Sequence, residues 1–465
     1  MSNFLSINNI LDVDSYKSSH ENQYVPGAEW MYSYLESRGG QYDKTVFFGL
    51  QYLMQKYLRG CFCSETDVKE AACFFKNHGE PFPYEGWMRI ATHHDGRLPI
   101  RIKAVPEGTV VPTHNILMSV ESTDPEVFWV VSWLETQFVR MWYPTTVASK
   151  SWHIKRNILR YLHQTSEDPM GQIPFKLHDF GARGVSSRES AGIGGMAHLV
   201  NFQGSDTVEG VRYANHYYNH PMAAFSIPAS EHSTITMWGR DREVEAYRNM
   251  LTQFAKPGAL VACVSDSYDF YRAVEEIWAG ELHQEVKDSG AVLVIRPDSG
   301  DPPEVVRETL QRLDRKVGCI KNKLGYKVLP AYFRIIQGDG VDEDPINEVY
   351  EESIRVGFSA DNINFGMGGA LLQLLNRDTQ RFAFKCSAAR VDGRTIPVYK
   401  DPVTDPGKKS KKGVLSLIRG ENGVLTTVEG EAPNDQLEVV FENGRILKET
   451  TLDEVRARAD ADLTV

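Results

Sequence analysis

Residues 291–300, AVLVIRPDSG, decide the fold of this chain. An apolar run, AVLVI, passes directly into a polar turn that carries Arg296 and Asp298. A short, continuous apolar run bounded by a turn is typical of a strand buried on both faces of a parallel sheet. Because parallel strands end on one edge of their sheet, the turn marks the edge where functional side chains are expected.

The same pattern of apolar run and polar turn recurs on both sides of this segment. Helical stretches separate several copies, at about 240–255, 269–279, 303–313 and 344–356. The repetition predicts a β/α barrel, and an open doubly wound sheet is the alternative. The other copies are FKLHDFGARG (175–184), HLVNFQGSD (198–206), AAFSIPASEHS (223–233), LVACVSDS (260–267), YFRIIQGDG (332–340) and NINFGMGG (362–369).

The segments that flank the barrel have a different pattern. Residues 98–120 alternate between apolar and polar positions, which is typical of short strands and turns. Asp124 is expected to cap a helix over about 127–142, and a second helix follows at about 147–164. Hairpin turns are expected at three dipeptides in the last part of the chain: Asp392-Gly393, Asn422-Gly423 and Asn443-Gly444.

The predicted fold class is therefore α/β, with two domains. An irregular β/α barrel-like catalytic domain is expected over residues 166–374. A β-rich α+β domain is expected from the N- and C-terminal segments, residues 1–165 together with 375–465.

Composition excludes several classes of protein. The chain has 465 residues and a net charge of 51 − 62 = −11, which argues against a nucleic-acid-binding protein. No run of about 18 apolar residues is found, so no membrane span is expected. The N-terminal residues lack a basic start and a long apolar core, and six cysteines form no disulfide framework. A cytoplasmic location is expected.

The turns after the predicted strands share a mixed set of polar groups. Carboxylates with glycine-rich turns fit a magnesium-chelated phosphate ester better than a structural zinc site. Glycines allow backbone N–H groups to approach an anion. The residues at these turns are His178, Asp179, Phe180, Arg183, Asp206, Glu231, His232, Asp266, Arg296, Asp298, Asp339, Gly366, Gly368 and Gly369.

Each of these residues also has a structural interpretation. His178 or His232 alone would more often be a structural histidine, and Asp266 could cap the next helix. Arg296 and Asp298 could simply pair with neighbours. The functional interpretation is favoured because such groups recur at one position in each unit. Residues 400–412 are locally basic and fit either a solvated loop or a clamp for phosphate.

The chain resembles the nicotinamide phosphoribosyltransferases, which belong to the type II phosphoribosyltransferases, across nearly its whole length. The motifs that carry the resemblance are long and dispersed. They are DVDSYKSSH (12–20), YSYLESRG (32–39), FFGLQY (47–52), IKAVPEG (102–108), STDPE (122–126), KLHDFGARGVSSRESAGIGG (176–195), HLVNFQGSDTV (198–208), PASEHSTIT (228–236), VSDSYD (264–269), IRPDSG (295–300), IQGDGVD (336–342) and KDPVTDPGKKSKKG (400–413).

The resemblance implies a pentosyltransferase of NAD salvage. Such enzymes convert nicotinamide and 5-phosphoribosyl-1-pyrophosphate into nicotinamide mononucleotide and pyrophosphate with Mg²⁺. They are homodimers with two active sites at the subunit interface. The resemblance also implies ATP as a coupling substrate, because His232 matches the histidine that these enzymes phosphorylate.

It further implies a role for each matching residue. Phe180 and the partner's Tyr16 should sandwich the pyridine ring, with Asp206 and Arg296 at the carboxamide. The catalytic set is His232, Asp298, Arg296 and Asp266, and magnesium would lie at Asp266 and Asp298. The ribose and phosphate set is Arg183, Asp298, Gly338, Asp339, Gly368, Gly369, Arg377 and Lys385. The pyrophosphate set is Arg38, Lys400 and Lys408.

Two other enzyme functions and one non-enzymatic role are possible alternatives. A nicotinate phosphoribosyltransferase would bind a carboxylate, which Asp206 would repel, so the amide is favoured. A metal-dependent barrel hydrolase would need a histidine-rich ligand set, and only His178 and His232 lie at strand ends. A signalling protein would not need this array of charged loop groups.

Overall fold

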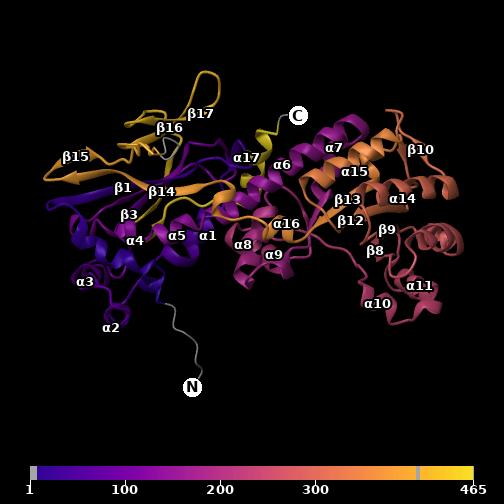
Figure 1. Ribbon diagram of the computed structural model, residues 1–465, viewed down its shortest axis with the longest axis horizontal. Coiled ribbons are helices and arrows are strands. Elements are labelled where there is room, and N and C mark those ends of the chain that lie inside the picture. Colours follow the sequence, from indigo (N-terminus) through magenta and orange to yellow (C-terminus); the bar gives the residue numbers. More distant parts are fainter. Residues whose placement is uncertain (1–7, 405–408, 464–465) are drawn as a thin grey trace. The chain divides into compact units, whose positions relative to one another are not determined.

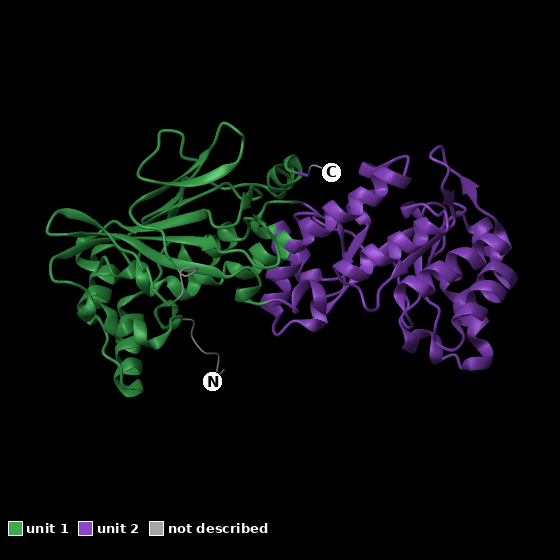
Figure 2. Ribbon diagram, turned by 45° about the horizontal axis from the view of Figure 1, so that its top comes forward, with its two compact units in different colours: residues 1–149, 216–220, 376–462 green, residues 150–215, 221–375, 463–465 purple. Residues whose placement is uncertain are grey.

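The computed structural model describes residues 8–404 and 409–463. The chain forms two compact units (Figure 2). Unit 1 falls within residues 1–149, 216–220 and 376–462, and unit 2 within residues 150–215, 221–375 and 463–465. The division at residue 149 lies inside helix α6 (Trp142–Thr165), and the predicted domain boundary lies at the end of that helix.

Unit 2 contains a six-stranded parallel sheet in the order β7-β6-β13-β12-β9-β8. These strands account for six of the seven apolar runs, which confirms the α/β prediction. Strands β8, β9, β12 and β13 lie side by side in sequence order, as do β6 and β7, and β13 pairs with β6, which is the strand order of a β/α barrel. Their bounds are β6 (Leu177–Asp179), β7 (Gly204–Ser205), β8 (Leu260–Val264), β9 (Val292–Arg296), β12 (Phe333–Gln337) and β13 (Ile363–Met367).

The seventh run, residues 223–233, forms no regular strand, so that part of the prediction is wrong. It makes only isolated bridges, Gly204 with Phe225 and Ala229 with Ala262. Pro228 has no N–H group to donate and so interrupts a ladder, although its carbonyl accepts from Ala262 N at 2.9 Å. Because the two bridges join the segment to β7 and to β8, it links the two edge strands and closes an irregular barrel.

The expected helices of unit 2 are present (Figure 1). Asp301 caps α14 through its side chain, which accepts from Glu304 N, and Pro302 occupies the first helical position. Asp342 caps α15 in a similar way. The helices are α8 (Arg188–His198), α9 (Val208–Tyr217), α10 (His232–Thr236), α11 (Glu243–Phe254), α12 (Phe270–Arg272) with a π-helix (Ala273–Glu281), α13 (His283–Ser289), α14 (Pro302–Val317) and α15 (Glu343–Arg355).

A buried lysine holds the start of β6 beside the start of β13. Lys176 is 1% exposed, and its Nζ donates to the carbonyls of Ala360, Asp361 and Ile363 at 2.9–3.1 Å. These two neighbouring strands carry Phe180 and the glycines of residues 366–369 at their other ends. The lysine therefore helps to fix the register between β6 and β13, which sets the positions of Phe180 and these glycines.

Lys176→Met should destabilise the protein without changing its fold. The variant keeps the apolar stem but removes the Nζ donor from three carbonyls, two of which lie in fully buried bonds; Ala360 O keeps its bond from Ile363 N. Unsatisfied buried carbonyls cost about 1–3 kcal/mol, so a loss of about 2–4 kcal/mol in the free energy of unfolding is expected. Urea unfolding measures it, with the exposed Lys323→Met as the control. Equal unfolding midpoints for the two variants would contradict this role.

Unit 1 is built on a seven-stranded sheet in the order β15-β14-β1-β5-β3-β18-β19. The two longest strands, β14 and β1, pair over most of their length and run side by side in Figure 1. The β18–β3 pairing confirms that the C-terminal strands join those of residues 98–120. The sheet strands are β1 (Ala28–Ser37), β3 (Ile100–Ala104), β5 (Ile116–Ser122), β14 (Phe382–Val391), β15 (Arg394–Pro397), β18 (Glu438–Glu442) and β19 (Arg445–Ile446).

Two smaller features of unit 1 test the sequence prediction. Hairpin turns occur where they were expected, and residues Asp392, Gly393, Asn443 and Gly444 all have positive φ. The second pair of strands, β16 (Leu415–Arg419) and β17 (Leu425–Glu429), turns at Asn422-Gly423. A helix also follows near Leu452 as expected, α17 (Leu452–Ala461).

The single helix predicted over residues 127–142 is wrong. Asp124 and Pro125 begin a short 3-10 turn (Pro125–Val127), and α4 (Val130–Trp133) and α5 (Glu135–Val139) follow as separate pieces. On one continuous helix Trp129 and Phe138 would lie about 180° apart. Both side chains are buried, and the breaks allow both to face the interior.

Candidate functional site

Phe180 forms the centre of the candidate site in unit 2. Asp179 Oδ1 accepts from Gly181 N at 2.7 Å, and Phe180 N donates to Met367 O at 2.9 Å, which together fix the turn after β6. Burial raises the pKa of Asp179 to about 6. The Phe180 ring lies directly over Gly366, where an added Cβ would come within 1.9 Å of Cε2. This glycine therefore makes room for the ring.

Arg296 lies close to the Phe180 ring. Its Cζ is 5.7 Å from the Phe180 ring centroid, and Gly338 leaves space for both side chains. Arg296 Nη2 donates to Asp298 Oδ1 at 2.6 Å, so the two residues pair with each other. Arg296 Nε is buried and has no hydrogen-bond partner among the described residues. A buried donor without a partner is costly, and a ligand oxygen near the ring would satisfy it.

Asp206 belongs to a polar network that reaches the same ring through His178. His178 Nε2 is 2.9 Å from Asp206 Oδ1, and the Ser226 hydroxyl donates to the same oxygen. Burial alone would raise the pKa of Asp206, but the bonds from His178 and Ser226 and the charge of Arg296 hold the pKa below its ordinary value. The carboxylate is therefore charged and accepts hydrogen bonds.

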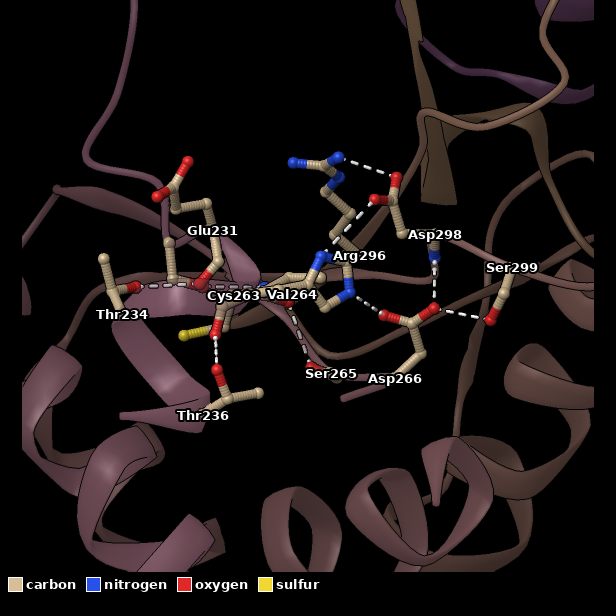
Figure 3. Close-up of polar contacts among 12 residues, drawn as sticks. Glu231, Thr234, Thr236, Cys263, Val264, Ser265, Asp266, Arg296, Asp298 and Ser299 are labelled. Carbon is tan, nitrogen blue, oxygen red and sulfur yellow. Dashed lines mark hydrogen bonds and ion pairs between the residues drawn. The ribbon is translucent and has the colours of Figure 1, made fainter. Parts of the chain in front are cut away.

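His232 is held between two carboxylates (Figure 3 labels both). Its Nε2 is 2.9 Å from Asp266 Oδ1, and its Nδ1 is 3.9 Å from Asp298 Oδ2. Asp266 Oδ2 accepts from Asp298 N at 3.3 Å and from the Ser299 hydroxyl at 2.5 Å. Asp266 does not cap the next helix, whose N-cap is Asp269, but joins the turns after β8 and β9 to His232.

The remaining predicted residues of unit 2 line the open part of this edge. Gly368 and Gly369 have almost no neighbours where a Cβ would stand, and α16 (Gly369–Leu372) begins at Gly369. Arg183, in the 3-10 turn Ala182–Gly184, and Asp339 are exposed. The structure therefore leaves room for a phosphate here.

A second group of predicted residues lies in unit 1. Burial lowers the pKa of Lys385; the nearby charges of Arg38, Lys17 and Lys400 add to this, and Glu135 opposes it. Arg38, Lys17 and Lys400 therefore all lie near Lys385. Tyr16 precedes Lys17 and contacts the His20 ring, and it is 55% exposed, so part of its ring is accessible to a ligand.

Two predicted residues are not placed in that group. Arg377 is exposed and pairs with Asp378 at 3.1 Å. Lys408 lies outside the described residues.

Sequence reasoning missed several residues that organise these groups. Lys17 is 5% exposed and pairs with Glu135, whose other oxygen is 4.0 Å from Lys385. Buried Glu36 pairs with Arg38 at 2.7 Å and also with Lys411. Lys17 could have been found from the sequence, because it directly follows Tyr16 in the motif at residues 12–20. Ser226, Glu36 and Glu135 gave no signal because their partners are remote in the sequence.

The residues present fit a magnesium ion shared with a substrate. Mg²⁺ in phosphoryl and pyrophosphate sites takes one or two carboxylates and completes its shell with phosphate oxygens and water. Asp266 and Asp298 supply hard oxygen donors next to each other. No cluster of three or more His, Cys, Asp or Glu side chains suited to a metal occurs in residues 8–404 and 409–463, so the protein alone offers no complete shell.

The same part of the chain has no helix long and apolar enough to span a membrane.

Solved structures with similar folds define the class. The nicotinate-nucleotide pyrophosphorylase from Pyrococcus furiosus has a TM-score of 0.63 and 16% identity, covering 99% of this chain and 98% of its own. Human nicotinic acid phosphoribosyltransferase has a TM-score of 0.55 and 15% identity, covering 98% and 93%. The fold is that of the phosphoribosyltransferases.

The chain belongs to the nicotinate phosphoribosyltransferase (NAPRTase) family, whose model matches residues 175–445. Residues 8–102 match the nicotinamide phosphoribosyltransferase N-terminal domain. The nicotinamide phosphoribosyltransferase of Xanthomonas campestris pv. campestris (strain 8004) is 54% identical, covering 98% of both chains. That of Acinetobacter baylyi is 32% identical, covering 97% of both. These findings confirm the resemblance and the phosphoribosyltransferase class.

Proposed function

We propose that this protein is a nicotinamide phosphoribosyltransferase that makes nicotinamide mononucleotide and pyrophosphate in NAD salvage. The observation that carries the proposal is the charged carboxylate of Asp206, which is linked to the Phe180 ring through His178. A carboxylate accepts hydrogen bonds from a carboxamide NH₂ and repels the carboxylate of nicotinate. The names of the two bacterial relatives and the N-terminal domain match support the same substrate.

The site would position the ring and stabilise the leaving group. The ring nitrogen attacks C1 of the ribose as the bond from C1 to the pyrophosphate oxygen breaks. This nitrogen carries no proton to be removed, so no general base is needed. Phe180 would hold the ring in line, with Asp206 on the amide nitrogen and Arg296 Nε on the amide oxygen.

The pyrophosphate would be stabilised by positive charge. Bound Mg²⁺, held by Asp266 and Asp298, would neutralise charge that develops on the leaving group. Asp298, Gly338 and Asp339 would meet the ribose, and the space at Gly368 and Gly369, with Arg183, would take the 5′-phosphate. The cations Arg38, Lys385 and Lys400, with Arg377 and Lys408, would hold the phosphate and pyrophosphate groups.

We also propose a homodimer with shared sites. Tyr16 and the cations near Lys385 belong to unit 1, whereas the ring-binding residues belong to unit 2. In this arrangement the partner's Tyr16 would complete the ring sandwich over Phe180.

The proposed location is the cytoplasm, because six free thiols and no disulfide fit a reducing compartment.

ATP coupling would use His232. Asp266 accepts from Nε2, which leaves the Nδ1 lone pair as a nucleophile on a half-exposed ring. Nδ1 would attack the γ-phosphorus of ATP, forming a P–N bond as the P–O bond to ADP breaks. Water would later cleave the P–N bond and release phosphate.

His232→Ala should therefore abolish ATP stimulation but keep some ATP-independent synthesis, because the ring and pyrophosphate contacts remain. The measurement is mononucleotide yield with and without ATP, together with acid-labile ³²P labelling of the protein. His283→Ala, in the same unit, is the matched control and should keep both. Equal stimulation in the His232 variant and the wild type would exclude this role.

The direct test of the proposed function is a product assay. Incubation with nicotinamide, phosphoribosyl pyrophosphate and Mg²⁺ should give the mononucleotide and pyrophosphate in equal amounts by mass spectrometry. Release of ribose phosphate alone would instead support a hydrolase.

A further inference from the structure

One side chain contacts both residues that the proposed function assigns to the nicotinamide ring and amide. His178, in β6, is 15% exposed at its side chain. Its Nε2 is 2.9 Å from Asp206 Oδ1, and its ring centroid is 5.2 Å from that of Phe180. No role in the reaction described above falls to this histidine.

The chemistry fixes the direction of the hydrogen bond. Asp206 is ionised, because its pKa lies below the ordinary value, and a carboxylate can only accept. His178 Nε2 therefore carries the hydrogen and donates it. The Ser226 hydroxyl donates to the same oxygen, Oδ1, and Oδ2 has no hydrogen-bond partner in residues 8–404 and 409–463. The two donors thus hold one oxygen and leave the other for a ligand.

A glycine on the neighbouring strand makes this placement of the ring possible. Gly204, in β7, pairs with His178, and an added Cβ there would lie 2.7 Å from His178 Nδ1. Gly204 has no positive φ, so alanine fits the backbone and only the contact with the imidazole forbids it. The imidazole is therefore wedged between Gly204 on one side and Asp206 on the other.

We propose that His178 is a positioning residue for substrate selection, which holds the Asp206 carboxylate so that its free oxygen receives the carboxamide NH₂. This inference rests on the proposed function. His178 acts through Asp206 and does not itself bond the substrate. A fixed acceptor is worth more than a mobile one, because its orientation is not lost on binding.

His178→Ala should raise the KM for nicotinamide by about tenfold or more, the scale of a bond to a charged group. The KM for phosphoribosyl pyrophosphate should stay within about twofold, because its proposed contacts lie elsewhere on this edge and in unit 1. His178→Gln, which retains an N–H donor, should restore most of the affinity. Gly204→Ala removes no polar group but displaces the ring, and should raise the nicotinamide KM in the same direction.

The control is His283→Ala. His283 Nε2 is 3.0 Å from the Tyr332 hydroxyl in the same unit, so the variant loses a comparable bond away from the site. Its KM for nicotinamide should match the wild type. Circular dichroism checks that every variant is folded, and the Gln and Gly204 variants test the idea even if His178→Ala does not fold.

A double-mutant cycle with Asp206→Asn closes the test. If His178 acts through Asp206, the double variant His178→Ala/Asp206→Asn should have the same nicotinamide KM as Asp206→Asn alone. The inference would be overturned if the KM increases of the two single variants multiplied in the double variant, or if His178→Ala left the nicotinamide KM unchanged. A wild-type enzyme that uses nicotinate and not nicotinamide would instead overturn the proposed function, and the inference with it.

Discussion

Gly366→Ala should reduce kcat/KM for nicotinamide at least about 100-fold, because a misplacement of about 1 Å at a reacting group has this effect. The new Cβ would lie 1.9 Å from Phe180 Cε2 and 2.4 Å from Cδ2, so the ring must leave its position. The methyl group itself is small and fits a strand. The loss should therefore come from the displaced ring, and steady-state kinetics with nicotinamide as the varied substrate measures it.

Introducing Gly366→Ala into the Phe180→Ala variant shows whether the loss of activity comes from displacement of the ring or from a wider disturbance of the fold. Phe180→Ala alone removes a stacking contact worth about 0.5–1.5 kcal/mol beyond its buried area. Once the ring is absent, Gly366→Ala has nothing to displace, and the double variant should be as active as Phe180→Ala. A further large loss in the double variant would show that Gly366 acts on something other than the ring.

Mixing two inactive variants should restore activity if the sites are shared between subunits. Tyr16→Ala impairs ring stacking, and Asp298→Ala impairs the ribose and metal side. In the proposed dimer, Tyr16 serves the partner's barrel and Asp298 serves its own. A mixed dimer then has one site with both defects and one with neither, so it should show about half the wild-type activity.

The experiment needs proof of subunit exchange. Differently tagged variants, mixed under conditions that dissociate the dimer, can be purified as mixed dimers through both tags. Tyr16→Ala mixed with wild type is the control, and each such dimer keeps one normal site. Purified mixed dimers of the two variants without activity would show that Tyr16 and Asp298 serve the same site from one chain.

The barrel could be predicted because each strand is marked locally. A run such as LVACV or VLVIR followed by a polar turn is readable from the sequence, and the turn residues Phe180, Asp206, Asp266 and Arg296 gather as expected. Residues 223–233 could not be predicted in detail. Their apolar run resembles the others, yet Pro228 limits them to isolated bridges.

The contacts inside the site were less accessible from sequence. His178 lies 28 residues from Asp206, and Lys17 lies 118 residues from Glu135. Such pairs form only when distant segments fold together, and each residue type also occurs at ordinary surface positions. The broken helix at residues 127–142 has the same origin, because burial of Trp129 and Phe138 is decided by their neighbours and not by local propensity.

One measurement tests the central claim most directly: a competition between nicotinamide and nicotinate for a limiting amount of phosphoribosyl pyrophosphate. With both bases equimolar and isotopically distinct, mass spectrometry of the two mononucleotides gives the ratio of kcat/KM values in one reaction. The charged Asp206 carboxylate is 45% exposed at its side chain, and a bound base would cover it. It predicts a ratio of at least about 100 in favour of nicotinamide, the scale of discrimination that an unpaired or repelled group in a binding site provides. A ratio near one, or an excess of the nicotinate product, would contradict the account.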